Sequence, residues 1–212
     1  MEAPPVDSND MHVDAWYEAL AGIGLTFERT VIRDQIGKGA DMLLPALMPE
    51  LDEATRETLS AAHDDIFKMR FRSNVRPFPK ARDLLAHAHG LGQEVVLASS
   101  ASKDDLDIYL DLLQIRDLVA VMTSGDEVEN TKPAPEIFSK ALQKLQGITP
   151  SEAIVVGDTP YDMEAAGKCG IATVALRSGG LPTRSSWRRG RSGSTMMLLL
   201  CSPTMKNSPL GQ

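Results

Sequence analysis

The sequence predicts an α/β protein in which a parallel sheet is joined to a small all-helical lobe. Up to about Arg72, apolar residues recur at helical spacing, whereas from Val75 onward helical segments alternate with short runs that are apolar throughout. Apolar strands separated by helices are typical of a parallel sheet that is covered on both faces. We therefore expect a helical lobe over residues 11–72, an α/β core over residues 73–180, and an irregular tail over residues 181–212.

Two apolar stripes define the helical lobe. The residues of these stripes are Trp16, Leu20 and Ile23 in one, and Leu43, Leu44 and Leu47 in the other. In the core, the expected strands are 95–98, 119–122, 153–156 and 172–175, and the expected helices are 80–89, 102–113, 135–146 and 160–169. Ser102 has Asp105 three residues after it, which is typical of a helix N-terminus.

Polar side chains follow three of the expected strands. Ser99 and Ser100 end the first, Lys132 comes after the second, and Asp158 and Asp162 come after the third. Carboxyl ends of parallel strands meet at one edge of the sheet, where such folds bind ligands. Hydroxyls and an ammonium group suit phosphate oxygens, and carboxylates suit Mg²⁺. The pattern predicts a phosphoryl-transfer site.

Each of these residues also has a structural interpretation. Ser99 and Ser100 are candidates to cap the next helix, and Lys132 alone is typical of a solvated loop. Asp162 lies three residues after Thr159, a capping-box spacing. The order and spacing of all these elements together favour a site.

Three segments resemble the second, third and fourth motifs of the haloacid dehalogenase-like (HAD) hydrolases. They are 97–102 (LASSAS), 132–138 (KPAPEIF) and 157–166 (GDTPYDMEAA), and the branch they resemble contains phosphoglycolate phosphatase and β-phosphoglucomutase. Residues 7–12 (DSNDMH) and 36–39 (IGKG) resemble the start of that branch's helical cap and a cap loop that faces the substrate. The resemblance runs from about Val6 to Gly180.

The resemblance implies a Rossmann-like core with a helical cap, and an Mg²⁺-dependent phosphatase that acts on a small phosphorylated metabolite through an aspartyl-phosphate. Phosphomutase and dehalogenase chemistry remain alternatives within the family. By this likeness Ser99 and Lys132 are the catalytic residues that hold the phosphate. The implied substrate-binding residues are Ser99, Ser100, Lys132 and Lys38, and the implied Mg²⁺ ligands are Asp158 and Asp162.

The first motif of the family is not found in these 212 residues. Family members begin with an apolar strand ending Asp-x-Asp-Gly-Thr, whose first Asp attacks phosphorus, and that strand is the centre of the sheet, between those ending at Ala98 and Val156. Counting back from the cap, the nucleophile position falls at about Met1 or before it. We therefore expect this chain to be inactive as a phosphatase, and the alternative is a non-catalytic protein that binds a phosphate ligand or a partner.

The tail departs from the family pattern, which continues past Gly180 with an acidic helix and a strand ending near Tyr-Asp-Asp. If the reading frame is shifted by one base after Pro182, codons that are allowed for the residues of this tail can encode an acidic segment and a segment ending in Tyr-Asp-Asp. We therefore expect residues 183–212 to be read out of frame and to lie outside the core, with a basic arm that touches acidic surfaces or nucleic acid as the alternative.

Charge and composition limit the partners. The chain carries a net charge of −7, and since residues 181–212 hold five of its 22 basic residues and none of its 29 acidic ones, residues 1–180 carry −12. The negative charge of residues 1–180 is expected to repel nucleic acid. The longest apolar run, 196–200, is far below the ~20 residues of a membrane span. Two cysteines, with no export signal at the start, indicate a cytoplasmic protein with no membrane partner.

Overall fold

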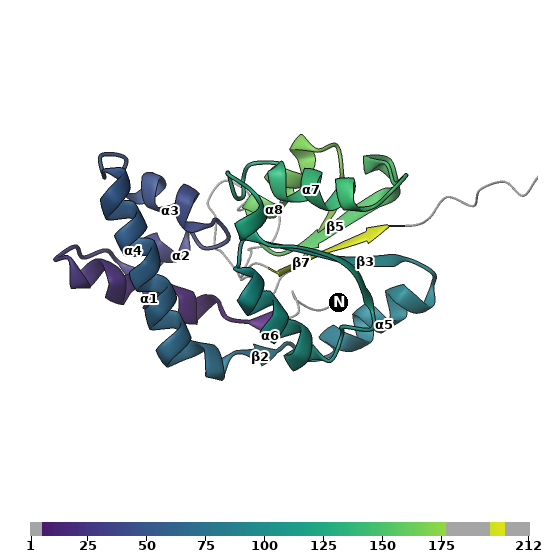
Figure 1. Cartoon of the computed structure of the whole chain (residues 1–212), viewed down its shortest axis with the longest axis horizontal. Coiled ribbons are helices and arrows are strands. Elements are labelled where there is room, and N and C mark those ends of the chain that lie inside the picture. The colour runs from purple at the N-terminus through teal and green to yellow at the C-terminus, as the bar shows by residue number, and fades with distance from the viewer. Residues whose placement is uncertain (1–5, 177–195, 202–212) are drawn as a thin grey trace, which may run out of the picture.

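The computed structural model describes residues 6–176 and 196–201, and Figure 1 shows how they are arranged. The helices are α1 (Asn9–Gly22), α2 (Arg29–Arg33), α3 (Ala40–Leu47), α4 (Glu53–Ile66), α5 (Ala81–Gly90), α6 (Lys103–Leu113), α7 (Glu136–Lys144) and α8 (Pro160–Lys168), with short turns η1 (Phe67–Phe71), η2 (Arg72–Asn74), η3 (Gly125–Glu127) and η4 (Pro150–Glu152). The strands are β1 (Val6–Asp7), β2 (Arg76–Pro77), β3 (Glu94–Ser99), β4 (Val119–Thr123), β5 (Ala153–Gly157), β6 (Ala172–Ala175) and β7 (Met196–Cys201). Within the described part, no helix has the length and apolar character needed to cross a membrane.

The main sheet has five strands in the order β4-β3-β7-β5-β6. β3 pairs in parallel with β4, and β5 pairs in parallel with β6, as the alternation of strands and helices predicts. The central strand β7 is antiparallel to both of its neighbours. β3 and β5 therefore run in the same direction, and their carboxyl ends lie at the same edge of the sheet.

Helices cover both faces of this sheet because its strands are apolar on both sides. Val95 and Leu97 face α5 and α6, whereas Val96, between them, faces α7 and α8 together with Val155 of β5. All four of these side chains are fully buried. The fold class predicted from the sequence, an α/β core with a helical lobe, is confirmed.

The helical lobe is built from α1, α2, α3 and α4, which form the left part of Figure 1. Trp16, Leu20, Leu43 and Leu44 are buried in its own apolar core, as the two stripes predict. Ile23 is different, because its side chain is 45% exposed. The reason is that α1 ends at Gly22, so the chain leaves the helical stripe before Ile23.

The expectation that the whole tail lies outside the core is wrong for Met196–Cys201. This segment is β7, and it fills the gap between β3 and β5 in which the family places its first strand (Figure 1). β3 and β5 each present a row of backbone N–H and C=O groups to that gap, and burying such groups unpaired is costly. The one apolar run of the tail pairs with both rows. The rest of the tail lies outside the described residues.

Candidate functional site

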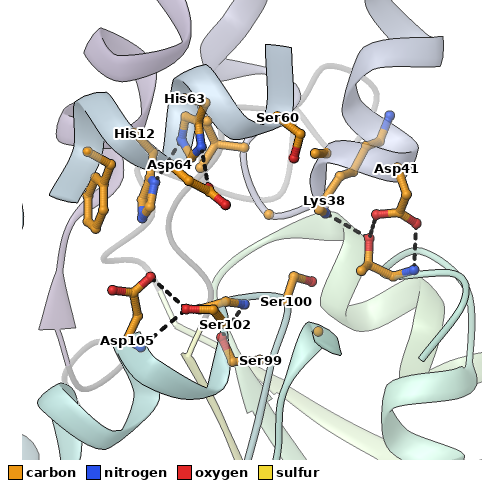
Figure 2. A pocket seen from close by; sticks show the side chains of 18 of the residues that line it. His12, Lys38, Asp41, Ser60, His63, Asp64, Ser99, Ser100, Ser102 and Asp105 are labelled. Atoms are coloured by element: carbon orange, nitrogen blue, oxygen red, sulfur yellow. Dashed lines mark hydrogen bonds and ion pairs between the residues drawn. The ribbon is translucent and has the colours of Figure 1, made fainter. Parts of the chain in front are cut away.

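A cavity of about 330 Å³ lies between the helical lobe and the carboxyl edge of the sheet. Figure 2 shows lobe residues above it and core residues below it. The lobe contributes His12, Ser60, His63 and Asp64; the segment before α3 and its first turn contribute Lys38 and Asp41; the core contributes Ser99, Ser100, Ser102, Asp105 and Thr131.

Two adjacent serines form the core side of the cavity. Ser99 ends β3, and its Oγ accepts a hydrogen bond from the backbone N–H of Ala101 at 3.1 Å. The Oγ of Ser100 is buried and has no hydrogen-bond partner among the described residues. Neither serine caps the next helix, because Ser102 is the N-cap of α6 and accepts from the backbone N–H of Asp105. The two hydroxyls are thus positioned for a ligand rather than for the helix.

Lys132 and Asp162 form a fully buried ion pair. Lys132 Nζ donates to Asp162 Oδ1 at 2.9 Å, and both side chains are 0% exposed. The other oxygen, Oδ2, accepts from the backbone N–H groups of Asp158 and Thr159 at 3.2 and 2.8 Å. The interpretation of Lys132 as a solvated loop lysine is therefore wrong. The capping box of Thr159 and Asp162 is present, but Asp162 also neutralises a buried cation.

Asp158 lies at the same sheet edge as Ser99. Leu198 of β7 pairs with Leu97 on one side and with Val156 on the other. Ser99 ends β3 two residues after Leu97, and Asp158 directly follows β5 two residues after Val156, so both lie near the start of β7. Asp158 is 1% exposed. Among the predicted site residues, Ser99, Ser100 and Lys38 line the cavity, whereas Lys132, Asp158 and Asp162 lie outside its lining.

The carboxylates at this edge do not by themselves fit a Mg²⁺ site. Magnesium requires near-octahedral oxygen ligation, and no group of three or more His, Cys, Asp or Glu side chains in the described residues is arranged to hold a metal. Asp162 already uses both oxygens, one for Lys132 and one for two backbone amides. Asp158 is the remaining predicted ligand, so Mg²⁺ at this edge would take its other oxygens from water or a bound phosphate.

Lys38 reaches the cavity from a loop that is pressed against the core. Its Nζ donates to Gln35 Oε1 at 2.7 Å and lies 4.7 Å from the centre of the Tyr161 ring. Burial lowers the pKa of Lys38 from its usual value. Gly37 has a φ of +110°, and a Cβ at this position would lie 2.9 Å from Thr159 Cγ2. Glycine is therefore needed for this close approach of the loop to the core.

Thr131 ties the lobe to the core beside the cavity. Its Oγ1 accepts from the backbone N–H of Gly39 at 2.8 Å and donates to Asp41 Oδ1 at 2.6 Å. Its own backbone N–H donates to Asp41 Oδ2 at 2.8 Å. Three hydrogen bonds thus fix the start of α3 against the loop that precedes Lys132.

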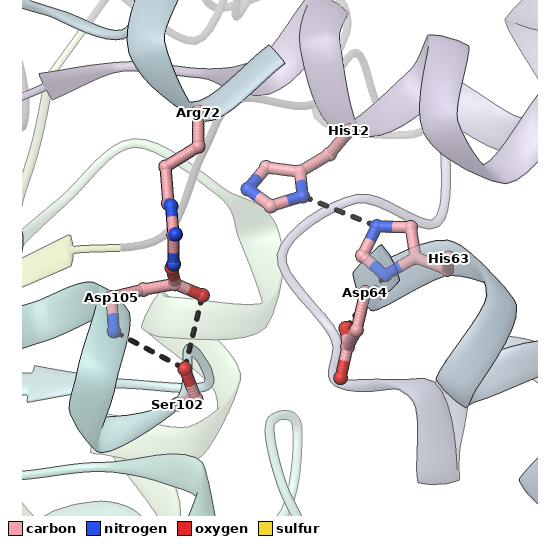
Figure 3. A network of polar contacts seen from close by, with 6 residues as sticks. All are labelled: His12, His63, Asp64, Arg72, Ser102 and Asp105. Carbon is pink, nitrogen blue, oxygen red and sulfur yellow. Dashed lines mark hydrogen bonds and ion pairs between the residues drawn. The ribbon is translucent and has the colours of Figure 1, made fainter. Parts of the chain in front are cut away.

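The lobe side of the cavity contains a hydrogen-bonded row of polar side chains that was not predicted as part of the site. His12 Nδ1 lies 3.3 Å from His63 Nε2, and His63 Nδ1 lies 3.0 Å from Asp64 Oδ1 (Figure 3). The His63 ring stacks on Trp16, and the His12 ring stacks on Phe67. Burial, reinforced by the neighbouring His63, lowers the pKa of His12 to about 3.

One sequence signal could have located this row. Ser60, His63, Asp64 and Phe67 are spaced at i, i+3, i+4 and i+7, which places them on one face of a helix. The contact with His12, 51 residues away, depends on how α1 packs on α4 and has no local signal.

Known proteins that are similar to this chain identify its family. The family model described as haloacid dehalogenase-like hydrolase matches residues 6–176 of the chain. The chain belongs to this family. It is 26% identical over 155 residues to a phosphoglycolate phosphatase of Vibrio vulnificus, a match that covers 70% of this chain and 68% of that protein.

Two further relatives show the same likeness. The HAD-like chain is 24% identical over 176 residues to a phosphorylated carbohydrates phosphatase of Thermotoga maritima, covering 82% of the chain and 81% of that protein. The solved structure of a hydrolase from Pseudomonas syringae superimposes with a TM-score of 0.78 at 28% identity, covering 86% of this chain and 83% of that one. The membership predicted from the three motifs is confirmed.

Proposed function

We propose that this HAD-like chain binds a small phosphorylated metabolite with the phosphate against Ser99 and Ser100, in the cavity beneath the helical lobe. The two hydroxyls donate to phosphate oxygens, and Ser100 Oγ makes no other hydrogen bond among the described residues. Lys38 supplies positive charge from the loop side. Lys132, which the resemblance implies for the same role, directly follows the lining residue Thr131, but its ammonium group is paired with Asp162.

Hydrolysis of the bound ester is the chemistry that membership of the family implies. An aspartyl-phosphate mechanism needs a carboxylate held in line with phosphorus. The strand between Ser99 and Asp158 is β7, whose sequence is MMLLLC and which contains no carboxylate. This observation carries the proposal that the 212-residue chain binds its ligand without turning it over at an enzymatic rate.

Mg²⁺ is part of this proposal as the family's cofactor, with Asp158 as the ligand that this chain would contribute. The described carboxylates do not complete a Mg²⁺ site, so no step of the reaction is assigned to the ion. The chain as written fits a non-catalytic phosphate-binding protein best. The second candidate function is a phosphatase, which the family membership favours. This activity would require a strand with a carboxylate side chain between β3 and β5. We place both forms in the cytoplasm and expect neither to bind nucleic acid.

The proposal is tested by titrating the 212-residue chain with inorganic phosphate in an isothermal calorimeter. We expect saturable binding that Ser100→Ala weakens by about tenfold, since the variant lacks a buried cavity hydroxyl that has no hydrogen-bond partner among the described residues. Ser73→Ala is the matched control, because Ser73 is exposed and lies outside the cavity. If phosphate does not bind, or binds equally to both variants, the site is not a phosphate site.

A further inference from the structure

The charges around the cavity are strongly unequal. Among the described residues that line it, Lys38 is the only lysine or arginine. The carboxylates in the same lining are Asp41, Asp64, Asp105, Asp126 and Glu129. A phosphate monoester near neutral pH already carries more negative charge than Lys38 balances, so no lysine or arginine in this lining neutralises a further anionic group on a ligand.

Several of these carboxylates are held by the protein itself. Asp41 accepts two hydrogen bonds from Thr131. Asp105 accepts from Ser102 Oγ at 3.0 Å and forms an ion pair with Arg72 at 3.5 Å (Figure 3). Arg72 lies outside the lining and its charge is used by Asp105. Asp64 is different, because its side chain is 52% exposed and contacts the ring of His63.

The row from Asp64 to His12 presents acceptors to the cavity when both rings are neutral. A carboxylate only accepts, so His63 Nδ1 donates to Asp64 and His63 Nε2 carries no proton. His12 Nδ1 therefore donates to His63 Nε2, and His12 Nε2 is left as an acceptor. The low pKa of His12 keeps its ring neutral over the physiological range. Acceptors of this kind pair with hydroxyl groups and repel carboxylates.

We propose that the ligand of this site is a phosphate monoester with an uncharged, hydroxyl-bearing body, such as a polyol or sugar monophosphate, and that the wall formed by His12, His63 and Asp64 selects against a carboxylate or a second phosphate. The inference rests on the proposed function and names the substrate class of the same site. Specificity of this type comes from a repulsive element as much as from an attractive one.

The size of the cavity agrees with a small phosphate monoester as the ligand. About 330 Å³ lies at the lower end of the range for small-molecule pockets. The relatives include proteins named for an acidic ester, phosphoglycolate, and for phosphorylated carbohydrates. The charge of the lining therefore decides between them.

Glycerol 3-phosphate and 3-phosphoglycerate test the inference directly, because they differ only in a CH₂OH group against a carboxylate. Calorimetric titration of the 212-residue chain at pH 7.5 measures both dissociation constants. We expect glycerol 3-phosphate to bind at least about tenfold more tightly, the scale of one unfavourable charge contact in a partly buried site. Asp64→Asn is expected to strengthen the binding of 3-phosphoglycerate several-fold. Asp65→Asn is the matched control, since Asp65 is exposed and outside the lining.

The outcomes separate this inference from the function on which it rests. If 3-phosphoglycerate binds as tightly as glycerol 3-phosphate or more tightly, the substrate class is wrong while phosphate binding stands. If Asp64→Asn and Asp65→Asn behave alike, the lobe wall does not select. If neither ester nor inorganic phosphate binds, the proposed function fails and this inference fails with it. Circular dichroism of each variant establishes that it is folded.

Discussion

The buried pair of Lys132 and Asp162 holds the loop before α7 against the start of α8. Removing one partner of such a pair leaves an uncompensated charge away from water. We expect Lys132→Met to lower the free energy of unfolding by about 3–5 kcal/mol, measured by urea denaturation. The double variant Lys132→Met/Asp162→Asn is expected to recover part of this loss.

A matched surface pair provides the control. Lys168 and Glu164 form an ion pair on α8 with side chains 45% and 53% exposed, and Lys168 Nζ also makes an exposed hydrogen bond to Pro133 O at 2.8 Å. Exposed pairs contribute about 0–1 kcal/mol, so Lys168→Met should have little effect. Equal losses in Lys132→Met and Lys168→Met would contradict the structural role of the buried pair.

His12 makes stability depend on pH. Its pKa is lowered in the folded chain from 6.5 to about 3, so the unfolded chain takes up a proton between these values while the folded chain does not. The unfolded state is therefore favoured as pH falls below about 6.5, and stability rises with pH over this window. We expect at most about 2 kcal/mol of loss between pH 7 and pH 5 from this ring.

Urea denaturation at several pH values checks this expectation. The variant His12→Gln should show a shallower dependence of unfolding free energy on pH than the natural chain. His87→Gln is the control, because His87 is exposed on α5. If unfolding free energy depends on pH equally steeply in both variants, the conclusion that His12 is buried and neutral is wrong.

The sequence predicted individual residues unevenly. Ser99 and Asp158 could be placed at one edge, because the carboxyl ends of parallel strands share it. The spacing of Thr159 and Asp162 predicted the capping box, yet the ion pair with Lys132 joins residues 30 apart and has no local pattern. Contacts of that kind arise from packing, so the structure was needed to find them.

Among the elements, the segment before α3 is attached to the core chiefly through Thr131. We expect Thr131→Val to lower stability by about 2 kcal/mol, because it removes two of the three hydrogen bonds to Gly39 and Asp41. Hydrogen exchange of residues 34–41 should also become faster. Thr58→Val, on the exposed face of α4, is the control. Unchanged exchange in Thr131→Val would show that the lobe is held elsewhere.

β7 is the element whose position matters most. Leu199 pairs with Val96 on one side and with Val155 on the other. Proline in a central strand removes a backbone donor and is excluded sterically. We expect Leu199→Pro to cost at least about 3 kcal/mol of unfolding free energy. Stability equal to that of the natural chain would show that this segment does not form the centre of the sheet.

The strands and helices of the core were predictable, and β7 was not. Each of the strands β3 to β6 is apolar and is followed by turn or cap residues, so its bounds were predicted to within about a residue. The run Met196–Leu200 has the same apolar character, but it lies in a basic, serine-rich tail. Its role follows only from the unpaired edges of β3 and β5, which belong to the tertiary structure.

At the scale of the whole molecule, the fold places a polar cavity between a helical lobe and the sheet edge at which we propose that phosphate binds. Lys38 provides positive charge, and Ser99 and Ser100 provide hydroxyls. The strand that fills the centre of the sheet provides no carboxylate. Binding and turnover are therefore separable in this chain, because they depend on different elements.

The most direct test of this separation is the rate at which the purified 212-residue chain hydrolyses p-nitrophenyl phosphate with Mg²⁺ present. We predict a turnover below about 0.001 per second, because β7 places no carboxylate at the centre of the sheet to act as the covalent nucleophile. A turnover of about 1 per second, typical of an enzyme, that is lost in Asp158→Asn would contradict the account.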